Sequence, residues 1–517
     1  MAKYICEHKA DVFPKQANNT GDMAAEAKED GGAEVAPTFD WVPEGCSPLA
    51  DGEYDVIVLG TGLTECILSG LMATQGRRVL HLDRNNYYGG PTASLNLTNL
   101  YKKFKGGAAP PDALGANRDW NVDLIPKFIM ACGKLVKILL HTKVTRYLEF
   151  KNIEGSYVGR FSKGGFFGGK EGLVVSKVPA TAMEAASTDI VGMFAKGALK
   201  KMLQYMAKYE AADASTHAGL DLSTMPMQAF YEHFGVSADV VSFVGHAMAL
   251  QKDDAYLARP AAETIDAVQL YCYSLERYGR SPYIYPLYGL GGLPEGFSRL
   301  CAIHGGTFML NRPVDEILFG DDGKAWGVKV PATEDEEDDQ NPKVAKAPMI
   351  IGDPSYFSEE KLSTVGQVVR SICFLDAPIP GTDGKESVQL IIPATAIGGG
   401  RKNDIYVCMV SHAHCVAARG KFIAIASTTV ETDAAGAEAE LAPAFRLMGG
   451  KMLERFTTVS DLRVPANDPA ADGCFISNDY DATSHFESVA EDVLRLYQQV
   501  TGEELDMSIS ADTVEEE

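Results

Sequence analysis

Residues 54–90, YDVIVLGTGLTECILSGLMATQGRRVLHLDRNNYYGG, decide the fold. An apolar run rich in β-branched residues, 56–59, leads into the glycine turn 60–62 and then into an amphipathic segment. A second apolar run follows at 79–82. This succession predicts a strand, a tight turn, a helix and a second strand. We therefore expect an α/β fold built on a Rossmann-type unit.

The turn has most of a dinucleotide-binding fingerprint but departs from it at one position. Gly60 and Gly62 permit the tight turn, and Asp83 lies about 20 residues on, where an acid would hold a ribose hydroxyl. The last glycine of Gly-x-Gly-x-x-Gly is replaced by Glu65. A carboxylate in the first helical turns competes for the positive field that would bind pyrophosphate. The sequence therefore indicates a Rossmann-type scaffold with a disabled cofactor site, and we expect no cofactor.

Length and composition favour a large globular protein. At 517 residues, 46% of them hydrophobic, the chain can form two or three domains. It has no apolar run of about 18 residues, and its first residues carry charges where a signal peptide needs an apolar core. The ten cysteines include no Cys-x-x-Cys pair, which indicates reduced thiols. We expect a cytoplasmic protein.

The net charge of −23 is concentrated in three short segments. Residues 1–50, 334–339 and 501–517 together contribute −18, so the rest of the chain is nearly balanced. We predict a disordered extension over 1–50, an acidic loop at 334–339 and an acidic tail over 501–517. No basic stripe is present, which excludes nucleic-acid binding.

Between residues 179 and 261 the apolar pattern becomes helical and predicts an inserted unit of about three helices. The first helix has an i, i+4 ridge of apolar residues: Ile190, Phe194, Ala198, Met202 and Met206. Ordinary core packing explains such a ridge. The high methionine content also favours a surface that repacks around an apolar guest.

The other elements alternate between helix and strand. A helix is expected from Phe128 to Leu139, a hairpin or loop at the glycine-rich segment 164–169, and a closing helix over 491–500. Hydrophobic runs predict buried strands at 327–330, 349–351, 372–375, 405–410 and 422–426.

No catalytic constellation is evident. His412 and His414 lie two residues apart beside a cysteine and could hold a metal, although structural hydrogen bonding is the simpler interpretation. The sequence contains no Gly-x-Ser-x-Gly elbow and no phosphate-binding Gly-x-x-x-x-Gly-Lys-Ser/Thr loop. We expect no enzyme activity and no metal.

Six motifs follow one another along the chain: the opening stretch 54–90, RDWNVDLIPKF (118–128), SLERYGRSPYIYPLYGLGGLPEGF (274–297), NDIYVCMV (403–410), IAIASTTVET (423–432) and DYDATSHFE (479–487). Together they resemble the Rab GDP dissociation inhibitors, a family that shares its larger domain with flavin monooxygenases yet binds no flavin. The resemblance implies a discontinuous Rossmann-like Rab-binding domain, 51–178 with 262–500. It also implies that the helical unit, 179–261, is a prenyl-binding domain followed by a mobile loop.

The resemblance implies a carrier that binds prenylated Rab GTPases in the GDP form, slows GDP release, extracts them from membranes and holds them in the cytosol. Such a carrier would be a monomer with transient membrane contact and a site for the geranylgeranyl lipid. Residues expected to contact Rab are Tyr88, Arg118, Glu276 and Arg277, with Lys252 and Tyr256 in the mobile loop. Residues expected to line the lipid cavity are Phe194, Met202, Met206, Phe230 and Val244.

Two alternatives remain open at this point. A Rab escort protein presents new Rabs to geranylgeranyl transferase, but such proteins carry large insertions, for which a body of about 450 residues leaves little room. A flavin-dependent oxidoreductase is disfavoured by Glu65.

Overall fold

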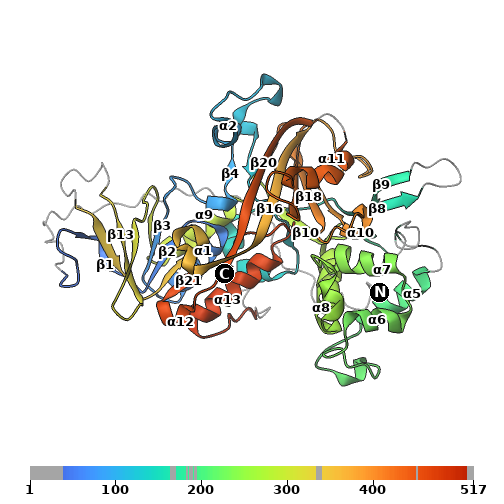
Figure 1. The fold of residues 1–517 in the computed structure, drawn as a ribbon, viewed down its shortest axis with the longest axis horizontal. Coiled ribbons are helices and arrows are strands. Elements are labelled where there is room, and N and C mark those ends of the chain that lie inside the picture. Colours follow the sequence, from blue (N-terminus) through green and yellow to red (C-terminus); the bar gives the residue numbers. More distant parts are fainter. Residues whose placement is uncertain are drawn as a thin grey trace.

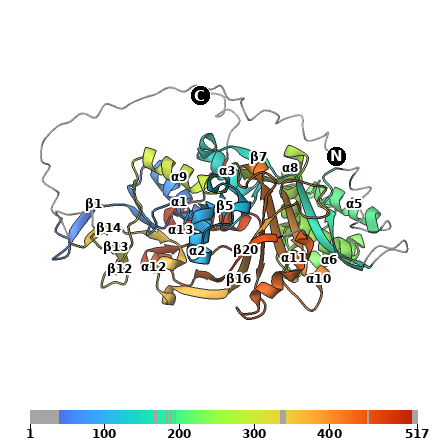
Figure 2. The same ribbon diagram turned by 90° about the horizontal axis from the view of Figure 1, so that it is seen from above.

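The computed structural model describes residues 39–163, 171–181, 184, 190, 192, 195–332, 341–449 and 452–508. Three parts follow one another along the long axis (Figure 1). A parallel sheet with a small accessory sheet forms one end, a seven-stranded sheet forms the middle, and a helical unit forms the other end. From above, α1 (Leu63–Thr74), α9 (Gly292–Ile303) and α13 (Glu487–Thr501) lie together at the parallel-sheet end, and α5 (Ala195–Met206) and α6 (Met227–Phe234) lie at the opposite end (Figure 2).

The parallel sheet contains the predicted strand–turn–helix–strand unit. Its five strands run in the order β11 (Thr307–Met309), β3 (Val79–Leu82), β2 (Val56–Leu59), β15 (Ile350–Gly352) and β21 (Cys474–Ile476). Every residue of β2 and β3 is buried, which explains their uninterrupted apolar runs. Helix α1 (Leu63–Thr74) packs against α9 (Gly292–Ile303) and α13 (Glu487–Thr501). The sequence prediction is confirmed for this unit.

The seven-stranded sheet forms the centre of the molecule. Its strands are β20 (Met452–Pro465), β16 (Leu362–Leu375), β19 (Phe422–Thr429), β18 (Ile405–Ser411), β17 (Val388–Ile392), β8 (Gly155–Lys163) and β9 (Glu171–Lys177), in that order. Only the β17–β8 pair among them is parallel. Three predicted strands lie here. The glycine-rich segment 164–169 lies outside the described residues, between the antiparallel strands β8 and β9.

Three smaller sheets complete the strands, and one corrects the predicted N-terminal extension. The four-stranded sheet has the order β1 (Ser47–Glu53), β14 (Lys343–Lys346), β13 (Ala325–Val330) and β12 (Glu316–Phe319). The three-stranded sheet has the order β6 (Ile129–Met130), β10 (Tyr283–Pro286) and β7 (Phe150–Asn152). The two-stranded sheet pairs β4 (Ser94–Leu95) with β5 (Val122–Asp123). Strand β1 pairs with β14, and Leu49 is buried. The prediction of disorder up to residue 50 is therefore wrong for residues 47–50, which belong to β1. Residues 1–38 lie outside the described residues.

The predicted helix at 128–139 begins later than expected. Helix α3 spans Lys134–His141, and the residues before it form β6, which pairs with β10. An apolar run fits both the helical and the strand period over so short a distance, so pairing with β10 decides the outcome. The other helices of the large part are α2 (Leu97–Lys105), α10 (Ala394–Ile397), α11 (Ala442–Met448) and α12 (Pro469–Asp472).

The helical unit is larger than the sequence indicated. It contains α5 (Ala195–Met206), α6 (Met227–Phe234), α7 (Ala238–Ser242), the π-helix η7 (Phe243–Met248), the 3-10 helix η8 (Asp254–Ala258) and α8 (Ala261–Tyr278). The Gln269 side chain on α8 donates to the carbonyls of Met206 (2.7 Å) and Tyr209 (2.8 Å). The unit thus continues past residue 261. In the part of the chain that the structure describes, no helix has the length and apolar character to span a bilayer.

Candidate functional site

The glycine turn at the start of α1 is covered by the side chain of Glu65. This residue is buried, and it accepts a hydrogen bond from Ser477 Oγ at 2.6 Å. A Cβ added to Gly62 would lie 2.4 Å from Glu65 Oε2, so the carboxyl group occupies the space directly over the turn. Burial, and next the charge of Asp353, raise the pKa of Glu65 to about 8.

Two more carboxyl groups complete this arrangement. A Cβ on Gly60, whose φ is +90°, would lie 2.7 Å from Asp353 Oδ2. Asp83 accepts from Thr61 N and Oγ1, both at 2.6 Å, and from Asn85 N at 2.7 Å, so its two oxygens are engaged by its own chain. A dinucleotide would meet both steric obstruction and acidic groups here. These residues do not fit the flavin cofactor that the fold implies.

The turn after β3 carries Tyr88 and is tied to the glycine turn. Gly89 N donates to Thr61 O at 3.0 Å. Gly89 has a φ of +101°, and a Cβ there would lie 2.8 Å from Ala93 Cα, so the position requires glycine. The Tyr88 ring is half-buried, 6.2 Å from the ring of Phe308. Tyr88 is therefore a fixed side chain with part of its surface exposed.

Arg118 is exposed on the short 3-10 helix η4 (Asn117–Asp119). The next aromatic residue, Trp120, is buried and donates from Nε1 to Leu114 O at 3.0 Å. Its ring centroid lies 4.4 Å from that of Phe374. This anchor fixes the backbone from which Arg118 projects. Glu276 and Arg277 are exposed on the last turn of α8.

A buried aspartate that the sequence analysis missed joins the segments that carry these residues. Asp123 accepts from Ser94 Oγ, from the Tyr285 hydroxyl and from Leu290 N, the last at 3.0 Å. Ser94 Oγ in turn accepts from Gly291 N at 2.9 Å. Burial raises the pKa of Asp123 to about 7. The only signal in the sequence was its place in the quoted motif RDWNVDLIPKF.

Asp123 therefore connects three regions. Strand β4 follows the turn of Tyr88, β5 follows the η4 helix of Arg118, and β10 follows the α8 turn of Arg277. The structure thus places these three predicted residues on segments that meet at one buried carboxyl group.

The two residues of the expected mobile loop have different environments. Lys252 is exposed, and its Nζ lies 2.5 Å from Asp481 Oδ2. Tyr256 is buried, and its hydroxyl donates to Val241 O at 3.2 Å. A Cβ on Gly245 would lie only 2.1 Å from that hydroxyl. Burial corrects the expectation that Tyr256 contacts a partner, because its ring packs inside the helical unit.

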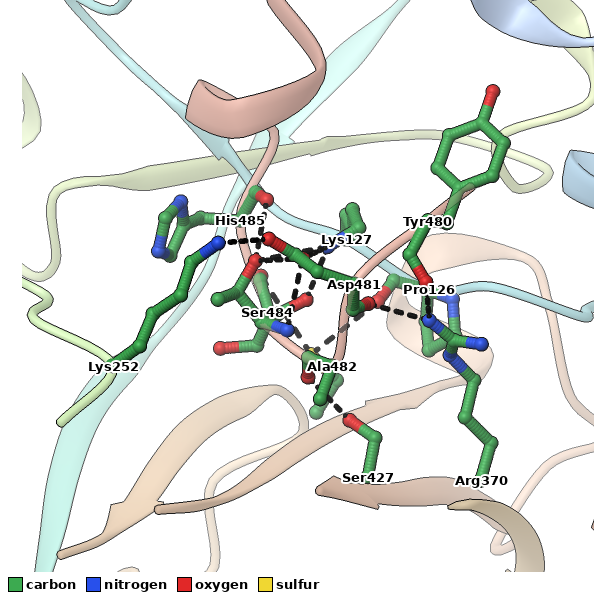
Figure 3. A network of polar contacts seen from close by, with 12 residues as sticks. Pro126, Lys127, Lys252, Arg370, Ser427, Tyr480, Asp481, Ala482, Ser484 and His485 are labelled. Carbon is green, nitrogen blue, oxygen red and sulfur yellow. Dashed lines mark hydrogen bonds and ion pairs between the residues drawn. The ribbon is translucent and has the colours of Figure 1, made fainter. Parts of the chain in front are cut away.

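Asp481 lies between two lysines that come from different parts of the chain (Figure 3). Its Oδ1 is 2.6 Å from the Nζ of Lys127, a fully buried side chain that also donates to Thr483 O at 2.6 Å. Its Oδ2 binds Lys252, on the loop after η7. Burial alone would raise the pKa of Asp481, but the two ammonium groups hold it well below its usual value. Burial lowers the pKa of Lys127 to about 8.

A second polar contact also joins the helical unit to the seven-stranded sheet. His246 on η7 is buried, with Nδ1 2.7 Å from Asp404 Oδ2 and Nε2 3.2 Å from Asp254 Oδ1. Burial alone would lower the pKa of His246, but the two carboxylates raise it to about 9. Ser242 Oγ lies 3.0 Å from Thr395 Oγ1 beside this contact.

The residues expected to line a lipid cavity form a closed core. Met202, Met206, Phe230 and Val244 are each at most 1% exposed. The Phe230 ring lies 5.0 Å from that of Phe234 and 5.7 Å from that of Tyr205. Phe194 lies outside the described residues.

The two histidines considered as metal ligands, His412 and His414, lie in different environments. His414 is buried, 5.7 Å from the Tyr285 ring, whereas His412 is exposed. Among the described residues, no group of three or more His, Cys, Asp or Glu side chains has the arrangement of a metal site.

Comparison with known proteins places this geometry in a family. A family model described as GDP dissociation inhibitor matches residues 50–512. The Rab GDP dissociation inhibitor beta of Canis lupus familiaris is 49% identical over 455 residues, which cover 88% of this chain and 96% of that protein. The crystal structure of the Rab GDI of Plasmodium falciparum is 46% identical, with a TM-score of 0.81, covering 88% of this chain and 99% of that one.

A more distant structure supports the fold alone. An oxidoreductase from Methanosarcina mazei superposes with a TM-score of 0.53 at 16% identity, covering 86% of this chain and all of that one. The expected Rossmann-type fold related to oxidoreductases is therefore confirmed. Since the family model spans most of the sequence and nearly half of the residues are identical to those of a member, the chain belongs to the GDP dissociation inhibitor family.

Proposed function

We propose that this protein binds Rab GTPases in the GDP form, slows GDP release, extracts prenylated Rabs from membranes and carries them in the cytosol. The observation that carries the proposal is the family match over residues 50–512, with relatives named as Rab GDP dissociation inhibitors. Their names describe inhibitors, which agrees with a binding protein that catalyses no reaction. The obstruction of the glycine turn by Glu65 and Asp353 supports the same interpretation.

The Rab-binding surface consists of Tyr88, Arg118, Glu276 and Arg277. All four are wholly or partly exposed, and their segments are held together by Asp123. An arginine offers a planar set of donors suited to carboxylates and backbone carbonyls. Lys252 joins this surface only by exchanging its partner, because Asp481 already binds its ammonium group. We propose that this fixed surface recognises the folded GTPase.

The helical unit receives the geranylgeranyl lipid. Its methionines and aromatics are tightly packed, so the lipid enters by separating helices rather than by filling an existing cavity. Methionine suits such a change because its side chain repacks easily. Each CH₂ group buried contributes about 0.8 kcal/mol, which offsets the cost of opening. Met202, Met206, Phe230 and Val244, with Phe194, are the proposed lining.

This division assigns lipid binding to the helical unit, which we extend from 179–261 to the end of α8 at residue 278. Rab recognition falls to the Rossmann-like part, 51–178 and 279–500, together with the last turn of α8, which carries Glu276 and Arg277. The protein acts as a monomer that meets the membrane only transiently.

The test is extraction of Rab from membranes. Membranes bearing prenylated GDP-Rab are incubated with the protein and sedimented, and Rab is measured in the supernatant. We expect Rab to become soluble with GDP and to stay on the membrane with a GTP analogue. Failure with several Rabs would refute the proposal. Adding unprenylated Rab and geranylgeranyl transferase tests the escort alternative, which alone predicts prenylation.

A further inference from the structure

Tyr288, in the loop between β10 and α9, is the most exposed of the large apolar side chains in the part of the chain that the structure describes. It is 64% exposed. Among the described residues its ring has no aromatic or cation–π contact, and its hydroxyl has no hydrogen-bond partner. Packing within the protein therefore gives no reason for a large aromatic side chain at this position.

The backbone of Tyr288 gives no such reason either. Its φ is +67°, in the left-handed region that glycine adopts readily and bulky residues rarely do. Strained residues of this kind persist where the surrounding structure fixes them, and they cluster at sites that bind a partner or a ligand. A tyrosine that neither packs nor suits its own backbone points to a contact outside the chain.

Hydrogen bonds on both sides hold the loop of Tyr288 in place. Tyr288 N donates to His414 O at 2.9 Å. Two residues later, Leu290 N donates to Oδ1 of the buried Asp123 at 3.0 Å. The side chain thus projects from a fixed loop. A fixed loop lowers the entropy cost that a partner would meet on binding.

The same loop adjoins the segment of Tyr88 in the proposed Rab-binding surface. Asp123, which holds the loop of Tyr288, also accepts a hydrogen bond from Ser94 Oγ. Ser94 lies on β4, which follows the turn of Tyr88. Tyr288 and Tyr88 therefore lie on segments fastened to one carboxyl group.

The segment of Arg118 is joined to Tyr288 on the other side. The loop that accepts from Tyr288 N also accepts from the chain just after Arg118, since Asn121 N donates to Val416 O at 3.0 Å. Tyr288 thus lies between two segments that carry proposed Rab contacts, and its exposed side chain continues that surface.

We infer that Tyr288 is an anchor residue of the interface with the folded GTPase, where its ring enters an apolar depression on GDP-bound Rab. This inference rests on the proposed function. Tyrosine offers a large contact area with few rotatable bonds, and it is enriched among the residues that dominate binding energy. Continuity with the segments of Tyr88 and Arg118 selects Rab as the partner.

Tyr288→Gly tests the inference, because glycine removes the side chain and permits the same φ. The full-length variant is titrated with unprenylated GDP-Rab in a calorimeter, so that the lipid makes no contribution. We expect the affinity to fall about tenfold, which corresponds to about 1.4 kcal/mol. The midpoint of urea unfolding should not fall, since the lost side chain has no internal contact among the described residues.

Two control variants identify the ring of Tyr288 as the cause. Tyr288→Phe keeps the ring and should bind Rab with nearly native affinity. Ile303→Ala removes a side chain that is 60% exposed at the far end of α9, about 18 Å of helix away, and should leave the affinity unchanged.

The outcomes separate this inference from the proposed function. If the native protein binds Rab and Tyr288→Gly binds it equally well, the inference is overturned and the proposed function stands. A lower urea midpoint for Tyr288→Gly would also overturn it, because the tyrosine would then stabilise the protein itself. So would an equal loss of affinity in Ile303→Ala. Absence of Rab binding by the native protein would refute the proposed function and this inference together.

Discussion

Asp481→Asn separates the energetic roles of the two lysines that Asp481 binds. Asparagine has nearly the same shape and keeps Oδ1 as an acceptor for Thr483 N, so the main loss is the negative charge. Lys127 is fully buried and would then hold an uncompensated charge, which costs about 3–5 kcal/mol. The Lys252 side chain is 53% exposed, and an exposed pair contributes only ~0–1 kcal/mol. We therefore expect Asp481→Asn to destabilise the protein several times more than Lys252→Ala.

Urea unfolding at pH 7 measures this difference through the midpoint, provided that the m-value is unchanged. The pH dependence supplies an independent check. Because the folded protein holds the pKa of Asp481 below its unfolded value of about 3.9, the stabilisation is present above that pH. It is lost as the pH falls through the folded pKa. Asp481→Asn should therefore lose less stability than the native protein on acidification. Equal midpoint shifts for Asp481→Asn and Lys252→Ala would refute the reasoning.

Three further predictions concern the proposed Rab-binding surface and the helical unit. Arg277→Ala should weaken binding of GDP-Rab about tenfold in a titration and change the melting temperature little, because substitution of an exposed side chain typically alters stability by no more than about 0.5 kcal/mol. Protonated His246, facing Asp404, contributes roughly 3 kcal/mol to the free energy of unfolding, and this contribution is fully present below pH 6.5. Raising the pH through about 9 should remove it. His246→Gln should abolish this alkaline loss in unfolding experiments, and its persistence would contradict the assignment. Gly245→Ala should cost about 1–3 kcal/mol in thermal unfolding by displacing the Tyr256 hydroxyl, and an unchanged stability would argue against that packing.

The parallel sheet could be predicted because its strands are buried on both faces and therefore read as continuous apolar runs. Glu65 was identifiable because it occupies a position that a known pattern reserves for glycine. Asp123 and Asp481 could not be found in this way. Each is one aspartate among many, and its role depends on partners more than 150 residues away in sequence. Burial of Tyr256 was likewise hidden, because it depends on the absence of a side chain at Gly245.

Helix α8 makes hydrogen bonds both within the helical unit and to the large part of the molecule. Gln269 fastens it to the carbonyls of Met206 and Tyr209, and Ser274 Oγ, one turn before Arg277, accepts from Cys132 N in the large part at 3.0 Å. An α-helix of 18 residues is a stiff rod about 27 Å long. One continuous helix therefore joins the exposed turn that carries Arg277 to the residues packed around Met206, so the helical unit and the large part share a structural element.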